Sequence, residues 1–298
     1  MTDATTTVEG FQEAPPRVSE WRRFWRVFLQ RRIVIFGLVI LFLLVFSAIF
    51  ADVLAPHDAF RGNLADSLLT PNSTYWLGTD LQGRDTLSRL IFGTRTALMV
   101  GFVTVGIAAS IGFTLGLIAG YFGGIPSMII MRIMDALMGF PMLILAMLLA
   151  AILGGGIQNV IIALSIATLP GYARVMNGLT LSIRENDYIM AERSMGARNL
   201  RIMLSHIVPN ALPPMIVLVT LQLGGLIMAE AALSFLGIGI KPPGAAWGAM
   251  VNDGYKYLTM NPVLSFAPGI AIMLVVFAFN MVGDGLRDAL DPRLRGIL

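Results

Sequence analysis

Long stretches without a charged side chain limit the possible fold of this 298-residue chain more than any other feature. They cover residues 33–51, 97–131, 136–173, 207–229 and 258–283. An α-helix rises about 1.5 Å per residue, so roughly 20 apolar residues cross the hydrocarbon core of a bilayer, about 30 Å thick. The stretch 136–173 is too long for one helix and contains Gly154, Gly155 and Gly156, so we expect two spans joined by a tight external hairpin. The sequence therefore predicts an all-α membrane protein with six transmembrane helices.

The overall composition agrees with a membrane protein and narrows the chemistry. Hydrophobic residues make up 56% of the chain and charged residues only 13%, about half the charged fraction of a soluble domain. The chain has no cysteine and only two histidines, His57 and His206. Disulfides, thiolate metal sites and histidine-based metal sites are thereby excluded. We predict that this chain binds no metal and no cofactor, and we expect the lipid bilayer rather than nucleic acid as a partner.

The segment before the first span has the pattern of an amphipathic helix. Apolar residues recur at helical spacing, and five arginines are interleaved with them: Trp21, Phe24, Trp25, Phe28 and Leu29, with Arg22, Arg23, Arg26, Arg31 and Arg32. This pattern is typical of a helix lying in the membrane interface. The alternative is a helix packed on the surface of the protein itself. The first span begins some thirty residues into the chain and is followed by five more, so we interpret it as an uncleaved anchor.

Lysine and arginine counts indicate the orientation. With the N-terminus in the cytoplasm, 15 of the 21 lysines and arginines fall on the cytoplasmic side and 6 outside. Cytoplasmic loops carry the excess of positive charge, so we predict that both termini and the polar segment 184–209 face the cytoplasm. The chain then divides into a tail with the amphipathic helix (1–32), the first span and an external loop (33–96), a core of five spans (97–290) and a second cytoplasmic tail (291–298).

Two glycine-containing patterns have structural interpretations. The external loop carries Asp80, Arg84 and Asp85 beside turn-forming glycines; a calcium site is the alternative to a turn, but the loop lacks a series of regularly spaced oxygen ligands. In the second span, small residues recur every four positions at Gly112, Gly116 and Gly120. Such spacing lets helices approach closely in lipid, so we predict helix packing there rather than contact with a substrate.

The chain lacks the chemistry of an energy source. Its only lysines are Lys241 and Lys256, and neither belongs to a Gly-x-x-x-x-Gly-Lys phosphate-binding loop. We therefore predict that the chain is not an enzyme and does not hydrolyse ATP. No charged residue is expected deep in a span, where proton-coupled and sodium-coupled carriers usually place one. Energy for transport would have to come from another subunit.

The polar segment 184–209 resembles the EAA loop of membrane subunits of binding-protein-dependent ABC importers. The matching residues are Tyr188, Ile189, Ala191, Gly196, Ala197, His206, Ile207, Pro209 and Asn210. Further stretches resemble the C-type permease of the dipeptide, oligopeptide and nickel transporter group: 77–85, Phe140–Pro141, 233–237, Pro242–Pro243 with Trp247–Gly248, and 283–293. The resemblance covers residues 20–295 and implies the type I ABC importer permease fold in a bacterial inner membrane.

The resemblance also implies a role for segment 184–209. In that family the loop forms short coupling helices that dock on the ATPase, so the expected contact residues are Tyr188, Ala191, Glu192, Arg193, Gly196, Ala197, Arg198 and Arg201. One departure is that the family's glutamate position holds Met190, and the acid stands two residues later at Glu192. Binding of lipid headgroups is the alternative role of Arg193, Arg198 and Arg201.

The implied assembly contains a homologous second permease, two cytoplasmic ATPases that carry ATP and Mg²⁺, and an external solute-binding protein. Peptides are the substrates that the resemblance favours, with nickel chelates, glutathione and other small solutes as alternatives. Four polar residues within spans are candidates for the pathway lining, with helix-to-helix hydrogen bonding as the alternative: Thr168, Thr220, Gln222 and Asn280. A stand-alone carrier or channel is the rival function, and a receptor or scaffold is a third.

Overall fold

The computed structural model describes residues 20–290, so the tail 291–298 and residues 1–19 of the N-terminal tail lie outside the described residues. Within residues 20–290 the chain is helical, with one isolated β-bridge between Thr79 and Asp85. The elements are α1 (Glu20–Gln30), α2 (Arg32–Ile49), α3 (Ala51–Leu54), η1 (Leu64–Asp66), α4 (Thr86–Phe122), α5 (Gly124–Met138), α6 (Met142–Leu153), α7 (Ile157–Arg184), α8 (Asp187–Ser194), α9 (Asn199–Ile202), the π-helix η2 (Met203–Ile207), α10 (Val208–Phe235), α11 (Trp247–Tyr255) and α12 (Val263–Leu290).

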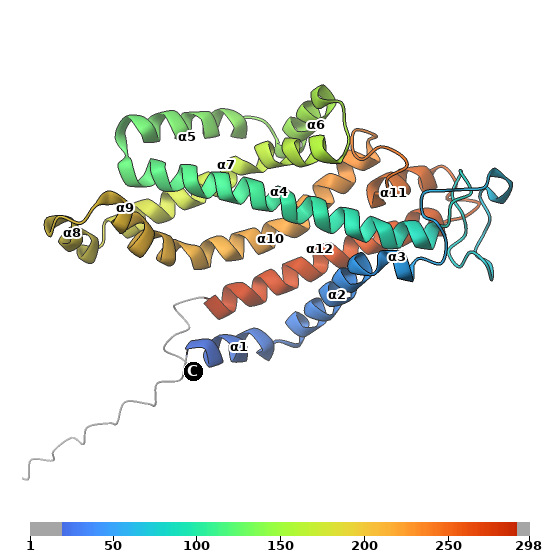
Figure 1. The fold of residues 1–298 in the computed structure, drawn as a ribbon, viewed down its shortest axis with the longest axis horizontal. Helices are drawn as coiled ribbons and strands as arrows, with labels where there is room; N and C mark the ends of the chain where they lie inside the picture. The colour runs from blue at the N-terminus through green and yellow to red at the C-terminus, as the bar shows by residue number, and fades with distance from the viewer. Residues whose placement is uncertain (1–19, 291–298) are drawn as a thin grey trace, which may run out of the picture.

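The long helices form a bundle with two polar ends. Within residues 20–290, five helical segments are long and apolar enough to cross a membrane, and α5 with α6 makes a sixth if this pair, bent by 90°, counts as one span. Figure 1 shows α8 and α9 at one end of the bundle, and the loop before α4 together with α11 at the other. We refer to these as the α8 end and the α11 end. The structure agrees with the predicted count of six spans if the bent pair α5 and α6 is counted as the third span.

The second span ends at the glycine turn that the sequence indicates, whereas the predicted start of the third span is wrong. The helix α4 ends at Phe122 because Gly123 adopts φ +65° and turns the chain into α5. The third was expected to begin at residue 136, but α5 begins at Gly124 and the break falls at residues 139–141, before α6. Pro141 is the N-cap of α6, and proline suits the start of a helix because it has no backbone N–H to be satisfied there.

Two of the long helices carry charged side chains, and the expectation that none lies deep in a span stays a prediction. Glu230 lies inside α10 with 1% of its surface exposed, and it accepts a hydrogen bond from the Ser234 hydroxyl at 2.6 Å. Arg174 in α7 forms an ion pair with Asp135 in α5 at 2.6 Å. The helices α7 and α10 continue beyond the uncharged stretches, so these residues lie within helices.

The predicted packing of the second span is confirmed. Gly112, Gly116 and Gly120 face α7, where a methyl group added to any of the three would meet the backbone or side chains of that helix. At Gly120 the added carbon would lie 2.6 Å from the Thr180 Cβ. Close backbone approach replaces the hydrophobic effect as the source of helix association in lipid. The glycines therefore bring α4 and α7 together, and α7 leads directly into the segment 184–209.

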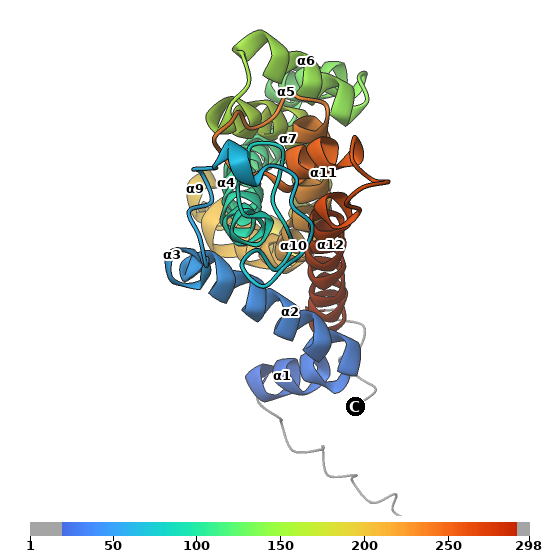
Figure 2. The ribbon, with the colours of Figure 1, turned by 90° about the vertical axis from the view of Figure 1, so that its right-hand side faces the viewer.

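The helix α1 forms where the apolar spacing predicted it and packs against the end of α12. Phe28 is buried with Val34 and Ala289, and Arg31 forms an ion pair with Asp288 at 2.9 Å. Trp21 remains 68% exposed. Figure 2 shows α1 and α2 on one side of the bundle and α5 and α6 on the opposite side. The position of α1 in the membrane interface stays a prediction.

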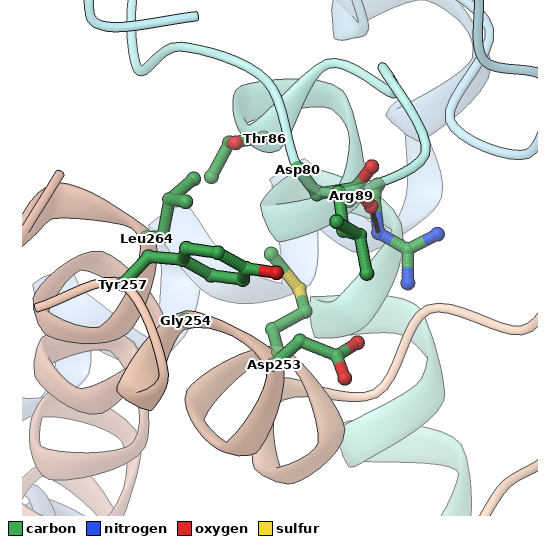
Figure 3. Close-up of a pocket in the computed structure, with 9 residues that line it drawn as sticks. Asp80, Thr86, Arg89, Asp253, Gly254, Tyr257 and Leu264 are labelled. Carbon is green, nitrogen blue, oxygen red and sulfur yellow. Dashed lines mark ion pairs between the residues drawn. The ribbon is translucent and has the colours of Figure 1, made fainter. Parts of the chain in front are cut away.

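Buried charges attach the loop before α4 to the first turns of α4. Asp80 accepts a hydrogen bond from Arg84 Nε at 2.7 Å and lies 3.4 Å from Arg89 Nε, and both arginines are almost fully buried. Asp85 caps α4 by accepting from the Ser88 N–H at 2.9 Å. Figure 3 shows Asp80 and Arg89 facing Asp253 and Tyr257 across a small cavity. The carboxylates that a calcium ion would need are thus bonded to arginines and to a helix terminus.

Candidate functional site

The two short helices of segment 184–209 are separated by residues 195–198, which include one glycine with positive φ. The helix α8 ends with the Gly196 N–H donating to the Arg193 carbonyl at 2.9 Å and the Ala197 N–H donating to the Glu192 carbonyl at 3.0 Å. This pair of bonds is the Schellman arrangement, which places a residue with positive φ just after the helix. Gly196 has φ +83°. The predicted bend at Gly196 is therefore present.

The inner face of the segment is anchored in the bundle. Ile189 of α8, Ile202 of α9 and Ile207 of η2 are completely buried, and they belong to one apolar cluster with residues of α4, α7 and α10 such as Tyr121 and Met176. The segment is therefore packed against three spans rather than suspended as a free loop. A displacement of α8 would be transmitted to those spans through this cluster.

Tyr121, at the end of α4, connects several parts of the segment. Its hydroxyl donates to Asn199 Oδ1 at 2.9 Å, and the Arg193 guanidinium lies 5.2 Å from the centre of its ring. Arg184 Nη1 donates to the Gly120 and Tyr121 carbonyls at 3.1 Å each. Sequence reasoning missed Tyr121, because it lies far from the segment in the chain and only the turn at Gly123 places it there.

The displaced acid, Glu192, has a partner within the segment. Glu192 Oε1 lies 3.5 Å from His206 Nε2, so α8 is linked to the π-helix η2 by a contact that strengthens when the imidazole is protonated. The Tyr188 ring lies 6.1 Å from the His206 ring. Met190, which stands where the family has its glutamate, is 52% exposed. Glu192 and Met190 thus face different surroundings: one is turned toward η2 and the other outward.

The outer face of the segment combines positive charge with exposed apolar side chains. The predicted contact residues Tyr188, Ala191, Arg193, Gly196, Arg198 and Arg201 are exposed, whereas Glu192 and Ala197 are partly covered. Between them the structure exposes four large apolar residues that sequence reasoning missed: Met190, Met195, Leu200 and Leu204. Grouped apolar side chains on a protein surface mark interaction sites. We call the six exposed predicted residues and these four apolar residues the α8–α9 surface.

The four predicted pathway residues do not share one environment. Thr168 is buried, and its hydroxyl donates to the Leu164 carbonyl at 2.8 Å within α7. Thr220 is partly covered and bonds to the Ile216 carbonyl in the same way, at 2.9 Å. Gln222 is partly covered and Asn280 is exposed, and neither side chain makes a hydrogen bond within residues 20–290. Thr168 therefore lies in the packed interior, while the role of the other three stays a prediction.

Comparisons with known families match two parts of the chain. Residues 112–296 match the family described as binding-protein-dependent transport system inner membrane component. Residues 19–71 match the N-terminal TM domain of oligopeptide transport permease C. The first match contains the whole segment 184–209, and the second contains α1 and α2.

Curated relatives cover almost the whole chain. A dipeptide transport system permease protein of Alkalihalophilus pseudofirmus is 42% identical over 93% of this chain and 91% of its own length. A glutathione transport system permease protein of Pectobacterium atrosepticum is also 42% identical, over 92% of both chains. Among solved structures, an inward-facing MetNI methionine ABC transporter chain aligns with a TM-score of 0.56 at 23% identity, covering 69% of this chain and 97% of that one. This last similarity concerns the fold.

Proposed function

The chain belongs to the family of binding-protein-dependent transport system inner membrane components, and from this premise we propose that it conducts peptides as the permease subunit of an ATP-driven importer. Proteins of this family are multi-pass inner-membrane subunits without a catalytic role. The peptide assignment is supported by the dipeptide and glutathione transport permeases, which are 42% identical to it.

The observation that carries the proposal is the α8–α9 surface. It presents Met195, 76% exposed, and Leu200, 63% exposed, beside Arg198 and Arg201 on helices whose other face is anchored in the bundle. Exposed apolar side chains rimmed by charge suit a protein partner. We assign this partner as a cytoplasmic ATPase, so the α8 end and both termini face the cytoplasm.

The proposed assembly contains two homologous permeases, two ATPases that bind ATP and Mg²⁺, and a solute-binding protein at the α11 end. Closure of the ATPase pair would displace α8 as a rigid body. The cluster around Ile189 would pass this displacement to α4 and α7, and η2 would pass it to α10. Such rigid-body movement of packed helices can switch a pathway between two discrete states.

Reconstitution tests this proposal. The chain, purified from native membranes, is expected to bring down an ATPase and a second permease, and the reconstituted complex is expected to take up a dipeptide only with ATP and the solute-binding protein. Uptake by the chain alone, driven by an ion gradient, would instead identify a secondary carrier and overturn the proposal. Met195→Asp is expected to abolish co-purification of the ATPase, while Trp76→Asp, a change of another exposed apolar residue, at the α11 end, is expected to leave it intact.

A further inference from the structure

The break between α5 and α6 exposes irregular backbone within an uncharged stretch. Gly139, Phe140 and Pro141 are exposed, and Phe140 has 54% of its surface free. The Gly139 and Phe140 N–H groups donate to the last carbonyls of α5, so the first N–H groups of α6 are the ones that lack a partner within a helix. Non-helical backbone at membrane depth is tolerated only where protein buries it or where it lines a water-filled cavity. The exposed side of this break therefore does not face lipid.

A charge cluster lies one turn before the break. Asp135 and Arg174 form their 2.6 Å ion pair with about half of each side chain exposed, 48% and 51%. Arg132 is exposed three residues before Asp135, on the same side of α5, and it forms no ion pair within residues 20–290. Ionisable groups in spanning segments are costly beside lipid and usually face a bundle interior or a water-filled cavity.

The exposed break at residues 139–141 and the charge cluster at Asp135 and Arg174 are independent indications that the same surface faces water. The irregular backbone and the charge cluster lie together on α5 and α7, on the side of the bundle away from α1 and α2 (Figure 2). Discontinuous spanning helices commonly form the substrate sites of transporters. The candidates named from sequence, Thr220, Gln222 and Asn280, lie instead on α10 and α12.

We propose that Asp135, Arg174 and Arg132 form a binding site in the pathway for the charged termini of a peptide. The carboxylate of Asp135 would pair with the peptide ammonium, and the guanidinium groups of Arg174 and Arg132 would pair with the peptide carboxylate, which arginine can bind through two parallel bonds. A zwitterionic peptide can displace the ion pair between Asp135 and Arg174, because each side chain then pairs with a peptide terminus of opposite charge. This assignment rests on the proposed function, because it takes a peptide as the transported solute.

Single cysteines test the exposure of this surface, since the chain contains no cysteine. In the full reconstituted complex, Phe140→Cys is expected to react with a hydrophilic methanethiosulfonate reagent, and dialanine is expected to slow the reaction. N-acetyl-dialanine amide, which lacks both charges, is expected to give no protection. Phe42→Cys, at a 68% exposed position on α2, is the control that should stay unreactive. An unreactive Phe140→Cys would overturn the assignment, because the break would then face lipid or a partner.

Substitutions that remove or exchange the charges of Asp135 and Arg174 distinguish a peptide-binding site from an ion pair with a purely structural role. Asp135→Asn and Arg174→Gln are each expected to raise the KM for dialanine uptake about tenfold, the size of one charge-assisted contact, with ATPase co-purification unchanged. The double variant Asp135→Arg with Arg174→Asp can re-form the pair but inverts the site, and it is expected to stay at least as defective as the single variants. Recovery of wild-type KM in the double variant would overturn the assignment. Failure of the wild-type complex to take up dialanine would instead count against the proposed function.

Discussion

At the scale of single residues, the segment 184–209 depends on one unusual backbone conformation and on a few side chains turned inward. Gly196 adopts φ +83°, and a carbon added to it would find no atom within 4 Å. Any penalty for replacing Gly196 therefore comes from the backbone conformation and not from crowding. The adjacent residues Ile189 and Met190 show the other feature, because one is fully buried and the other is half exposed.

The conformation of Gly196 leads to a graded prediction. Gly196→Val is expected to destabilise the α8–α9 connection by about 1–2 kcal/mol, since β-branched residues are disfavoured in the left-handed region. Gly196→Asn is the matched control, because asparagine enters this region more easily. The measurement is the ATPase activity of the reconstituted complex in response to the loaded solute-binding protein. Equal losses in both variants would contradict the backbone explanation.

Ile189 and Met190 should separate folding from docking. Ile189→Ala removes a buried side chain, for which losses of about 2–5 kcal/mol are typical, and we expect a lower midpoint of thermal unfolding for the purified permease. Met190→Ala is expected to leave that midpoint unchanged and to weaken only the binding of the ATPase. A stability loss at Met190 as large as that at Ile189 would show that the α8–α9 surface has been assigned to the wrong face.

At the scale of helices, the pair α4 and α7 carries the segment 184–209, and its packing rests on glycine. Gly116→Leu is expected to separate the two helices and to lower the thermal unfolding midpoint of the purified permease, since the added side chain would meet the Ala173 carbonyl and Met176. Gly106→Leu, on the same helix but with no atom within 4 Å of the added carbon, should have little effect. Equal midpoints for the two variants would contradict the packing role.

The loop at the α11 end should depend on Asp80 in a similar way. Asp80→Asn removes the ion-pair partner of the buried Arg84 and Arg89, and breaking a buried pair typically costs about 3–5 kcal/mol. Asp58→Asn removes an exposed partner of Arg61, 3.7 Å away, where such pairs contribute about 0–1 kcal/mol. Thermal unfolding of the purified protein is expected to show a large shift for Asp80 alone. The absence of a difference between the two variants would mean that the loop is held by other contacts.

The sequence predicted the features that have a local or periodic signal. Uncharged length located the spans, the four-residue spacing of glycines identified the packing face of α4, and apolar spacing located α1. Pro141 indicated a kink near the start of the third span, but α5 and α6 are both apolar, so composition alone does not distinguish a bent span from two neighbouring ones. Tyr121 and the Asp135–Arg174 pair were missed because each joins elements that are distant in the chain, and no pattern within either element reports the contact.

At the scale of the whole molecule, the two polar ends have different proposed partners, and the pathway runs between them. The α8 end offers apolar residues and arginines on helices anchored to three spans, which suits an ATPase. The α11 end offers a loop held by buried charges, which suits a solute-binding protein. Both proposals require the α8 end to lie in the cytoplasm, as the distribution of lysine and arginine predicts.

The most direct test of the central claim is cross-linking from single cysteines in the assembled complex. A photoactivatable cross-linker attached to Met195→Cys, on the α8–α9 surface, is expected to form a covalent adduct with the ATPase subunit, identified by mass spectrometry. The same cross-linker on Ser73→Cys, exposed in the loop at the α11 end, is expected to give no ATPase adduct. An intact complex in which Met195→Cys captures no ATPase, or in which Ser73→Cys does, would contradict the account.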